Sequence, residues 1–167
     1  MPPLFLGVDM FDYQVLNLTS AFYTAYPNPP YTEILTKDAR PYNCLLIQSH
    51  YDYFVCIPYR SQISHPYAFM FHRSKRSRRT KSGLDYTKIV IIKNSDYISS
   101  NGAIIDADEY VETRTYINTI KNDALAFVED YVSYCNGTSS INEKEFQRRY
   151  NYSSLQYFHK ELGIAEN

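Results

Sequence analysis

The sequence predicts an α+β fold, a compact twisted antiparallel sheet or small barrel with one long helix and short C-terminal helices packed on it. Two observations carry this prediction. Runs rich in β-branched and aromatic residues fill the first half of the chain, and such runs are typical of strands. In the second half, apolar residues recur every three or four positions, as they do along a helix that buries one face. The 167 residues suffice for one core, so we expect 1–167 to form a single domain.

Four runs in the first half are predicted to be strands: 43–49, 52–58, 67–71 and 86–93. The first two should form a hairpin around His50 and Tyr51, although the favoured Asn-Gly turn is missing. The short apolar run 4–8 is expected to add an edge strand. Segment 25–31 is too rich in proline for a helix or strand, so we expect a loop of polyproline character.

One long helix is predicted over 106–135. Its apolar residues fall on a single stripe: Val111, Ile117, Ile120, Ala124, Phe127, Val128, Tyr131 and Cys135. Acidic residues occupy its first turns, where the helix dipole favours anions. Two short helices are expected after it, because two serines are each followed three positions later by Glu or Gln, the spacing of a capping box: Ser140 with Glu143, and Ser153 with Gln156.

The basic residues are unevenly spread. The chain carries a formal net charge of −1, yet six of its 17 lysines and arginines lie between positions 73 and 81. They are Arg73, Lys75, Arg76, Arg78, Arg79 and Lys81. A local basic patch on a nearly neutral chain indicates contact with one polyanion, and we predict that this loop binds RNA. The alternative is a mobile, solvated loop.

Polar side chains are dense between positions 57 and 79, around the ends of two predicted strands. Because no acidic residue lies in this stretch, the sequence gives no local support for a metal site, and no cofactor is expected. RNA can instead be cut by its own 2′-hydroxyl group, which requires a base, an acid and a fixed cation. His65 or His72 would exchange protons, Arg60 would stabilise the phosphorane, and Ser61 would hold a phosphate oxygen.

Each of these residues also has a purely structural interpretation. His65 precedes Pro66 and could simply hydrogen-bond a turn, while Arg60 and Ser61 could form a salt bridge or cap at a strand end. The 18 tyrosines suit base stacking and equally suit a core whose hydroxyl groups are hydrogen-bonded. The sequence alone leaves these alternatives open.

The three cysteines are Cys44, Cys56 and Cys135, and none are arranged as C-x-x-C. We expect reduced thiols in a cytoplasmic protein. The N-terminus lacks the features of a secretion signal, and no apolar run is long enough to span a membrane, so no membrane partner is expected.

Two blocks of the sequence resemble a known family. The segment RPYNCLLIQSHYDYFVCIPYRSQISH (40–65), followed by SGLDYTKIVIIKNSDYI (82–98) and a predicted long helix, is similar to the ToxN, AbiQ and CptN toxins of type III toxin–antitoxin systems. The resemblance implies a twisted antiparallel sheet like that of the MazF and Kid toxins. It also implies a metal-independent endoribonuclease that leaves a 2′,3′-cyclic phosphate.

The resemblance assigns roles to four residues. Arg40 stands where the family often has a catalytic lysine, and Ser61 matches the serine of the family's Pro-x-Ser/Thr-Ser segment. Arg60 replaces the Thr or Ser before that serine, and His65 matches a nearby histidine. Arginine stabilises a phosphorane but is a poor proton acceptor, so His65 becomes the leading acid or base, with a tyrosine as the reserve.

The implied partners are RNAs. Proteins of this family process a repetitive antitoxin RNA, are inhibited by its pseudoknots in a protein–RNA hetero-oligomer, and cut cellular RNA when released. Two other hypotheses stay open from the sequence. The protein could bind RNA without cutting it, although it lacks the RNP and GXXG signatures of common RNA modules, or it could be a small protein-interaction domain.

Overall fold

The computed structural model describes residues 13–36 and 42–165. Its centre is the predicted hairpin, formed by β2 (Asn43–Gln48) and β3 (Phe54–Arg60). The two strands pair antiparallel with Leu45 opposite Ile57, so the hairpin prediction is confirmed. Nearly every side chain of both strands is buried, which explains why their sequences are continuous apolar runs rather than alternating ones.

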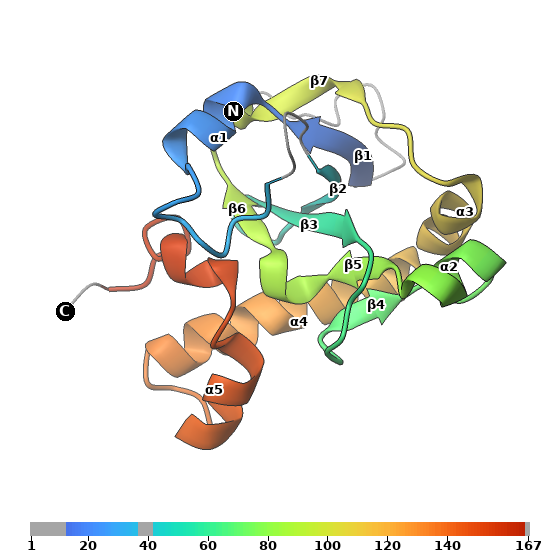
Figure 1. The fold of residues 1–167 in the computed structure, drawn as a ribbon. Helices are drawn as coiled ribbons and strands as arrows, with labels where there is room; N and C mark the ends of the chain where they lie inside the picture. Colours follow the sequence, from blue (N-terminus) through green and yellow to red (C-terminus); the bar gives the residue numbers. More distant parts are fainter. Residues whose placement is uncertain (1–12, 37–41, 166–167) are drawn as a thin grey trace.

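The described residues form one sheet of seven strands. Figure 1 shows how these strands are arranged. The order across it is β4 (Ala68–Met70), β5 (Gly83–Asp85), β3, β2, β1 (Tyr13–Leu18) and β7 (Ile98–Gly102). A further strand, β6 (Val90–Ile92), pairs with the first half of β3, while β5 pairs with its last residues. The sheet is not closed, since β4 and β7 end the order. The α+β prediction is therefore confirmed and the small-barrel alternative is wrong.

The pairing of β4 with β5 depends on Gly83. A Cβ atom at this position would lie 2.3 Å from the backbone oxygen of Phe69, so only glycine allows the two strands to approach this closely. Beyond β5 the predicted strand 86–93 is only partly a strand. Its first three residues form a 3-10 turn, η1 (Tyr86–Lys88), because the Asp85 side chain accepts a hydrogen bond from the Thr87 amide and caps that turn.

The predicted helix over 106–135 is two helices, α3 (Ala107–Thr115) and α4 (Ile117–Cys135), separated at Tyr116. The apolar stripe is correct for α4, whose buried residues are Ile120, Ala124, Phe127, Val128 and Tyr131. It is wrong for α3, which buries Glu109, Glu112 and Thr113 instead. The chain changes helix axis at Tyr116, where an apolar buried face replaces one that carries carboxylates.

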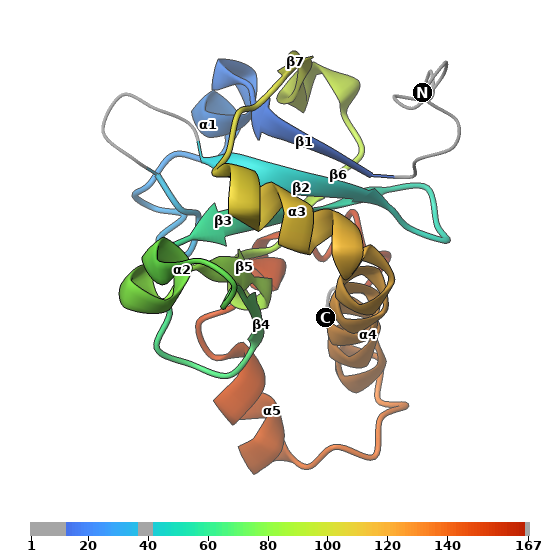
Figure 2. The ribbon, with the colours of Figure 1, turned by 90° about the vertical axis from the view of Figure 1, so that its right-hand side faces the viewer.

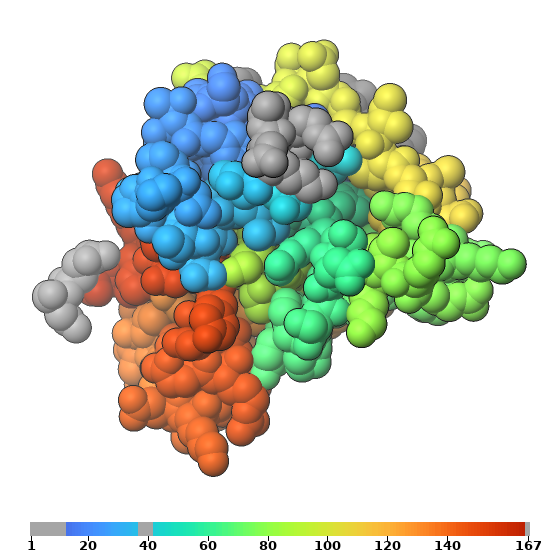
Figure 3. Space-filling view, viewed as in Figure 1, coloured from blue at the N-terminus to red at the C-terminus, as the bar shows by residue number. Residues whose placement is uncertain are grey.

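The sequence suggested that the basic segment is a loop. The structure instead contains a short helix there, α2 (Lys75–Thr80). Ser74 caps its N-terminus by accepting a hydrogen bond from the Ser77 amide at 2.9 Å. Lys81 ends it in the left-handed region, with φ of 52°. Figure 3 shows this segment, coloured green, standing out at one side of the molecule.

The remaining elements complete one hydrophobic core. A short helix, α1 (Ser20–Ala25), follows β1, a 3-10 turn, η2 (Ser95–Tyr97), precedes β7, and segment 26–31 has no regular structure. The two C-terminal elements are α5 (Glu143–Tyr150), capped by Asn142 rather than Ser140, and a single turn, η3 (Ser154–Tyr157), capped by Ser153.

α4 packs against β3, and α5 packs against α4 (Figure 2). The predicted edge strand at 4–8 lies outside the described residues. Within 13–36 and 42–165, no helix combines the length and the apolar character that a membrane span requires.

Candidate active site and basic surface

A cavity of about 270 Å³ opens where β3 ends. Its walls include the last residue of β3, Arg60, the following Ser61, and Arg76 from α2. Ile104 and Asp106, which precede α3, and Glu109 of α3 also line the cavity. The structure therefore brings two of the predicted catalytic residues together with one predicted RNA-binding residue.

Arg60 is fixed by a carboxylate that the sequence analysis did not single out. Its Nη1 lies 2.7 Å from Oδ2 of Asp85, the last residue of β5. The Asp85 side chain is completely buried, whereas about a third of the Arg60 side chain is exposed (32%). Because β3 and β5 pair with Arg60 opposite Gly83, this ion pair follows directly from the strand register. It holds the guanidinium group at the cavity wall while leaving other N–H donors available.

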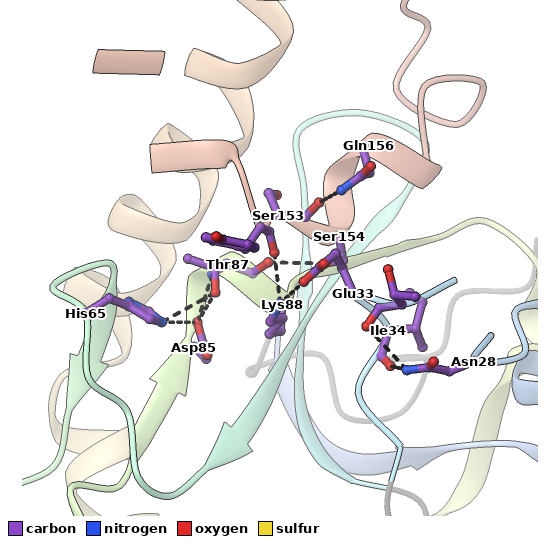
Figure 4. A network of polar contacts seen from close by, with 12 residues as sticks. Asn28, Glu33, Ile34, His65, Asp85, Thr87, Lys88, Ser153, Ser154 and Gln156 are labelled. Carbon is purple, nitrogen blue, oxygen red and sulfur yellow. Dashed lines mark hydrogen bonds and ion pairs between the residues drawn. The ribbon is translucent and has the colours of Figure 1, made fainter. Parts of the chain in front are cut away.

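His65 shares the same carboxylate (Figure 4). Its Nε2 lies 3.1 Å from Asp85 Oδ1, and its Nδ1 accepts a hydrogen bond from the Tyr67 amide at 3.1 Å. An acceptor nitrogen cannot carry a proton, so the neutral ring is protonated at Nε2, which donates to Asp85. Both ring nitrogens are thus engaged, and His65 is not among the residues that line the cavity.

Two further donors complete the environment of Asp85. The Thr87 hydroxyl donates to Oδ1 at 2.6 Å and the Thr87 amide donates at 3.0 Å. Lys88, which follows, binds the Glu33 carboxylate at 2.6 Å and the Tyr152 carbonyl at 2.8 Å, so the turn after Asp85 is anchored to distant parts of the chain (Figure 4). A buried carboxylate with donors on both oxygens is a rigid support for the side chains around it.

Ser61 is exposed at the cavity wall, and the loop that carries it is tied to the end of α2. The Gln62 amide donates to the Thr80 carbonyl at 2.7 Å, and the Ile63 amide donates to the Lys81 carbonyl at 3.1 Å. These two bonds fix Ser61 relative to α2, although 18 positions separate Gln62 from Thr80 in the sequence.

Two buried carboxylates of α3 hold the basic segment in place. Glu109 accepts hydrogen bonds from the Arg76 guanidinium group and, at 2.8 Å, from the Ser82 hydroxyl. Glu112 accepts from the amides of His72 at 3.1 Å and Arg73 at 2.7 Å. The acidic start of α3 therefore fixes the segment before α2, α2 itself and the residues after it, which is a larger role than the dipole effect expected from the sequence.

Of the six basic residues in this segment, only Arg76 is paired with an acidic side chain among residues 13–36 and 42–165. The other five are exposed and form no ion pair with any residue that the structure describes: Arg73, Lys75, Arg78, Arg79 and Lys81. We call these five side chains the basic surface. Their charges are not neutralised within the described chain, so they are available to an anionic ligand.

Tyr59 also borders the cavity but is poorly suited to act as a base. Burial raises the pKa of its phenol above the ordinary value, and its hydroxyl pairs with the Thr113 hydroxyl at 3.0 Å. The group therefore stays protonated at neutral pH.

The remaining predicted residues are dispersed. Arg40 lies outside the described residues. The His72 side chain is mostly exposed, with Nδ1 3.5 Å from Glu112. No group of three or more metal-binding side chains occurs within the part of the chain that the structure describes.

Sequence reasoning missed Asp85, Glu109 and Glu112. Asp85 did carry a local signal, since an Asp two residues before a Thr is typical of a capped turn. The partners of the two glutamates are more than 25 positions away, so no local pattern reveals them.

The chain was compared with models of known protein families, with curated proteins and with solved structures, and none of the three comparisons found a match.

Proposed function

We propose that the protein is a metal-independent endoribonuclease toxin of the ToxN, AbiQ and CptN kind, with a sheet related to that of MazF and Kid. The observation that carries this proposal is that Arg60, Ser61 and Arg76 line one cavity beside the basic surface. RNA bound through its phosphates along α2 would place a neighbouring phosphate at that cavity.

The proposed reaction uses no metal ion. The 2′-oxygen forms a bond to phosphorus as its proton leaves, and the bond from phosphorus to the 5′-oxygen breaks as that oxygen gains a proton from a solvent water molecule; the proton taken from the 2′-oxygen returns to solvent afterwards. The products are a 2′,3′-cyclic phosphate and a 5′-hydroxyl group. Negative charge grows on the phosphate oxygens during the attack, and the Arg60 guanidinium group would stabilise it. The Ser61 hydroxyl would donate a hydrogen bond to one of the same oxygens.

His65 is the general base of this proposal. Its Nδ1 would accept the 2′ proton after releasing the Tyr67 amide, and Asp85 would stabilise the resulting imidazolium ion through Nε2. This role requires residues 64–67 to shift so that the His65 ring reaches the cavity. Ser61 would stay in place, because the Gln62 and Ile63 amides hold it to the end of α2.

The proposed partners are target cellular RNA and an antitoxin RNA of pseudoknot repeats. The antitoxin would inhibit the enzyme by covering the basic surface in a protein–RNA hetero-oligomer. With five cations at phosphates, the logarithm of the binding constant for single-stranded RNA would fall with the logarithm of salt concentration at a slope of about −3.5. The proposed location is the cytoplasm.

A second candidate function is RNA binding without cleavage. It is favoured by one observation, that both nitrogens of His65 are already hydrogen-bonded and the side chain lies outside the cavity lining. In this case Asp85 serves only to stabilise the turn, and the basic surface is the whole functional site.

The rate of RNA cleavage by two matched serine variants distinguishes these candidates. Ser61→Ala removes a hydroxyl at the cavity wall, whereas Ser64→Ala removes an exposed hydroxyl of the same loop that does not line the cavity. We expect Ser61→Ala to lower the single-turnover rate at least about tenfold with unchanged RNA affinity, and Ser64→Ala to keep the wild-type rate. Equal rates for Ser61→Ala and the wild type would reject the assignment of the site. An inactive wild type that still binds RNA would support the second candidate.

A further inference from the structure

A second cavity, of about 230 Å³, lies at the other end of β3. Its lining comes from the hairpin tip between β2 and β3, from α4 and from the C-terminal segment: Tyr51, Tyr53, Glu129, Val132, Ser133 and Leu162. Tyr53 directly precedes β3 and Arg60 ends it, so the strand separates this cavity from the candidate active site by about 20 Å. The two cavities share no lining residue.

The aromatic wall of this cavity is held rigid by the hairpin turn. The rings of Tyr51 and Tyr53 are nearly parallel, at 14° with centroids 5.6 Å apart. The Ser49 hydroxyl donates to the Tyr53 carbonyl at 2.6 Å and accepts from the Tyr51 amide at 3.1 Å, which fixes both residues. Tyr51 is 57% exposed, so its ring can receive a flat group from solvent.

The charge at this cavity comes from Glu129. Its carboxylate is exposed and forms no ion pair with any residue in the described ranges. The neighbouring Asp52 is already paired with Lys93 at 3.1 Å. Burial is the largest cause that raises the pKa of Tyr53 to about 12, and Tyr51, Glu129 and Asp52 raise it further, in that order.

We propose that this cavity binds one guanidinium group, presented as an arginine side chain by a partner protein. A guanidinium group is flat and cationic, so it can stack on the Tyr51 ring and donate two hydrogen bonds to the Glu129 carboxylate. The Ser133 hydroxyl can accept a third, and Val132 and Leu162 can cover the methylene groups of the side chain. A lysine ammonium group offers no flat face and no paired donors, so arginine should bind more tightly.

The test is a chemical-shift titration of the ¹⁵N-labelled protein with N-acetylarginine amide, with N-acetylcitrulline amide as the uncharged analogue and guanosine monophosphate as the nucleotide alternative. We expect arginine amide to cause saturable shifts confined to 51–53, 129–133 and the neighbourhood of Leu162. Citrulline amide should bind at least about tenfold more weakly, because it lacks the charge. The absence of saturable shifts, or equal binding of the two amides, would overturn the proposal. Tighter binding of the nucleotide would instead assign the cavity to a base.

Variants locate the binding groups. Glu129→Gln should weaken the binding of arginine amide about tenfold, and Tyr51→Ala about threefold. The control is Glu143→Gln, which removes an exposed carboxylate at the start of α5, outside the cavity lining. An unchanged affinity in Glu129→Gln would contradict the proposal. The assay contains no RNA, so its result is independent of the proposed nuclease activity.

Discussion

Arg60 and Asp85 form an ion pair of 2.7 Å whose carboxylate is completely buried and whose guanidinium group reaches the wall of a cavity. The pair joins the end of β3 to the end of β5, and the same carboxylate binds His65. One buried anion therefore binds two of the residues that the sequence predicts to be catalytic. The stability of this part of the fold and the proposed catalysis therefore depend on the same contact.

Asp85→Asn should lower the free energy of unfolding by about 3 kcal/mol, because it leaves the partly buried Arg60 without its anion while preserving side-chain volume. Urea denaturation measures this change. The double variant with Arg60→Gln should lose less stability than the sum of the two single variants, since the first substitution already breaks the pair. Strict additivity of the two losses would show that the ion pair contributes nothing.

Arg76 and Arg78 are neighbours on α2 with different surroundings. Arg76→Gln removes a partner of the buried Glu109 carboxylate and should cost about 2 kcal/mol of stability. Arg78→Gln changes an unpaired surface cation and should cost less than about 0.5 kcal/mol. The two variants carry the same change in charge, so their urea midpoints compare the anchoring role directly. Equal midpoints would mean that Glu109 does not anchor α2.

The double variant Arg78→Gln with Arg79→Gln should weaken RNA binding and reduce the magnitude of the salt slope by about 1.4, because it removes two phosphate contacts to single-stranded RNA. The matched control is Lys144→Gln with Lys160→Gln. This control makes the same change in net charge at two exposed positions, on α5 and in the C-terminal segment. Fluorescence anisotropy at several salt concentrations gives the slopes. A similar loss in both double variants would indicate non-specific attraction rather than a site on α2.

Stability should fall steeply above pH 10. Burial is the largest cause that raises the pKa of seven tyrosines: Tyr23, Tyr26, Tyr53, Tyr59, Tyr86, Tyr131 and Tyr150. The folded chain therefore holds these protons more tightly than the unfolded chain, whose tyrosines titrate near pH 10. The resulting stability is fully present below pH 10 and is lost as the pH rises towards the folded values. Phenolate absorbance during alkaline titration should show one group of tyrosines that ionises together with unfolding, and gradual ionisation of all tyrosines in the folded protein would contradict this.

The sequence predicted the elements whose signals are local and strong. β2 and β3 are continuous apolar runs, and α4 carries a clear stripe from Ile120 to Tyr131. By contrast, β5 has only three residues, which is too short to show an alternation of apolar and polar residues. α2 has six residues and none of them is apolar, so it shows no helical hydrophobic period. A cap at Ser74 was the only local signal for α2, and it is a weak one.

The candidate site was predictable only in part for a related reason. The density of polar residues around the end of β3 identified Arg60, Ser61 and His65, because they are close in sequence. Their link to Asp85 arises from the pairing of β3 with β5, which no pattern within one segment encodes. The same holds for Glu109, whose position in the first turn of α3 already had a sufficient explanation in the helix dipole.

The most direct test of the central claim is to incubate purified, RNA-stripped protein with cellular RNA in excess EDTA and to determine the 3′ ends of any fragments. The predicted result is fragments that end in 2′,3′-cyclic phosphate and that form at least about tenfold more slowly with Ser61→Ala but at the wild-type rate with Ser64→Ala. Intact RNA, or cleavage only when a divalent metal is restored, would contradict the account.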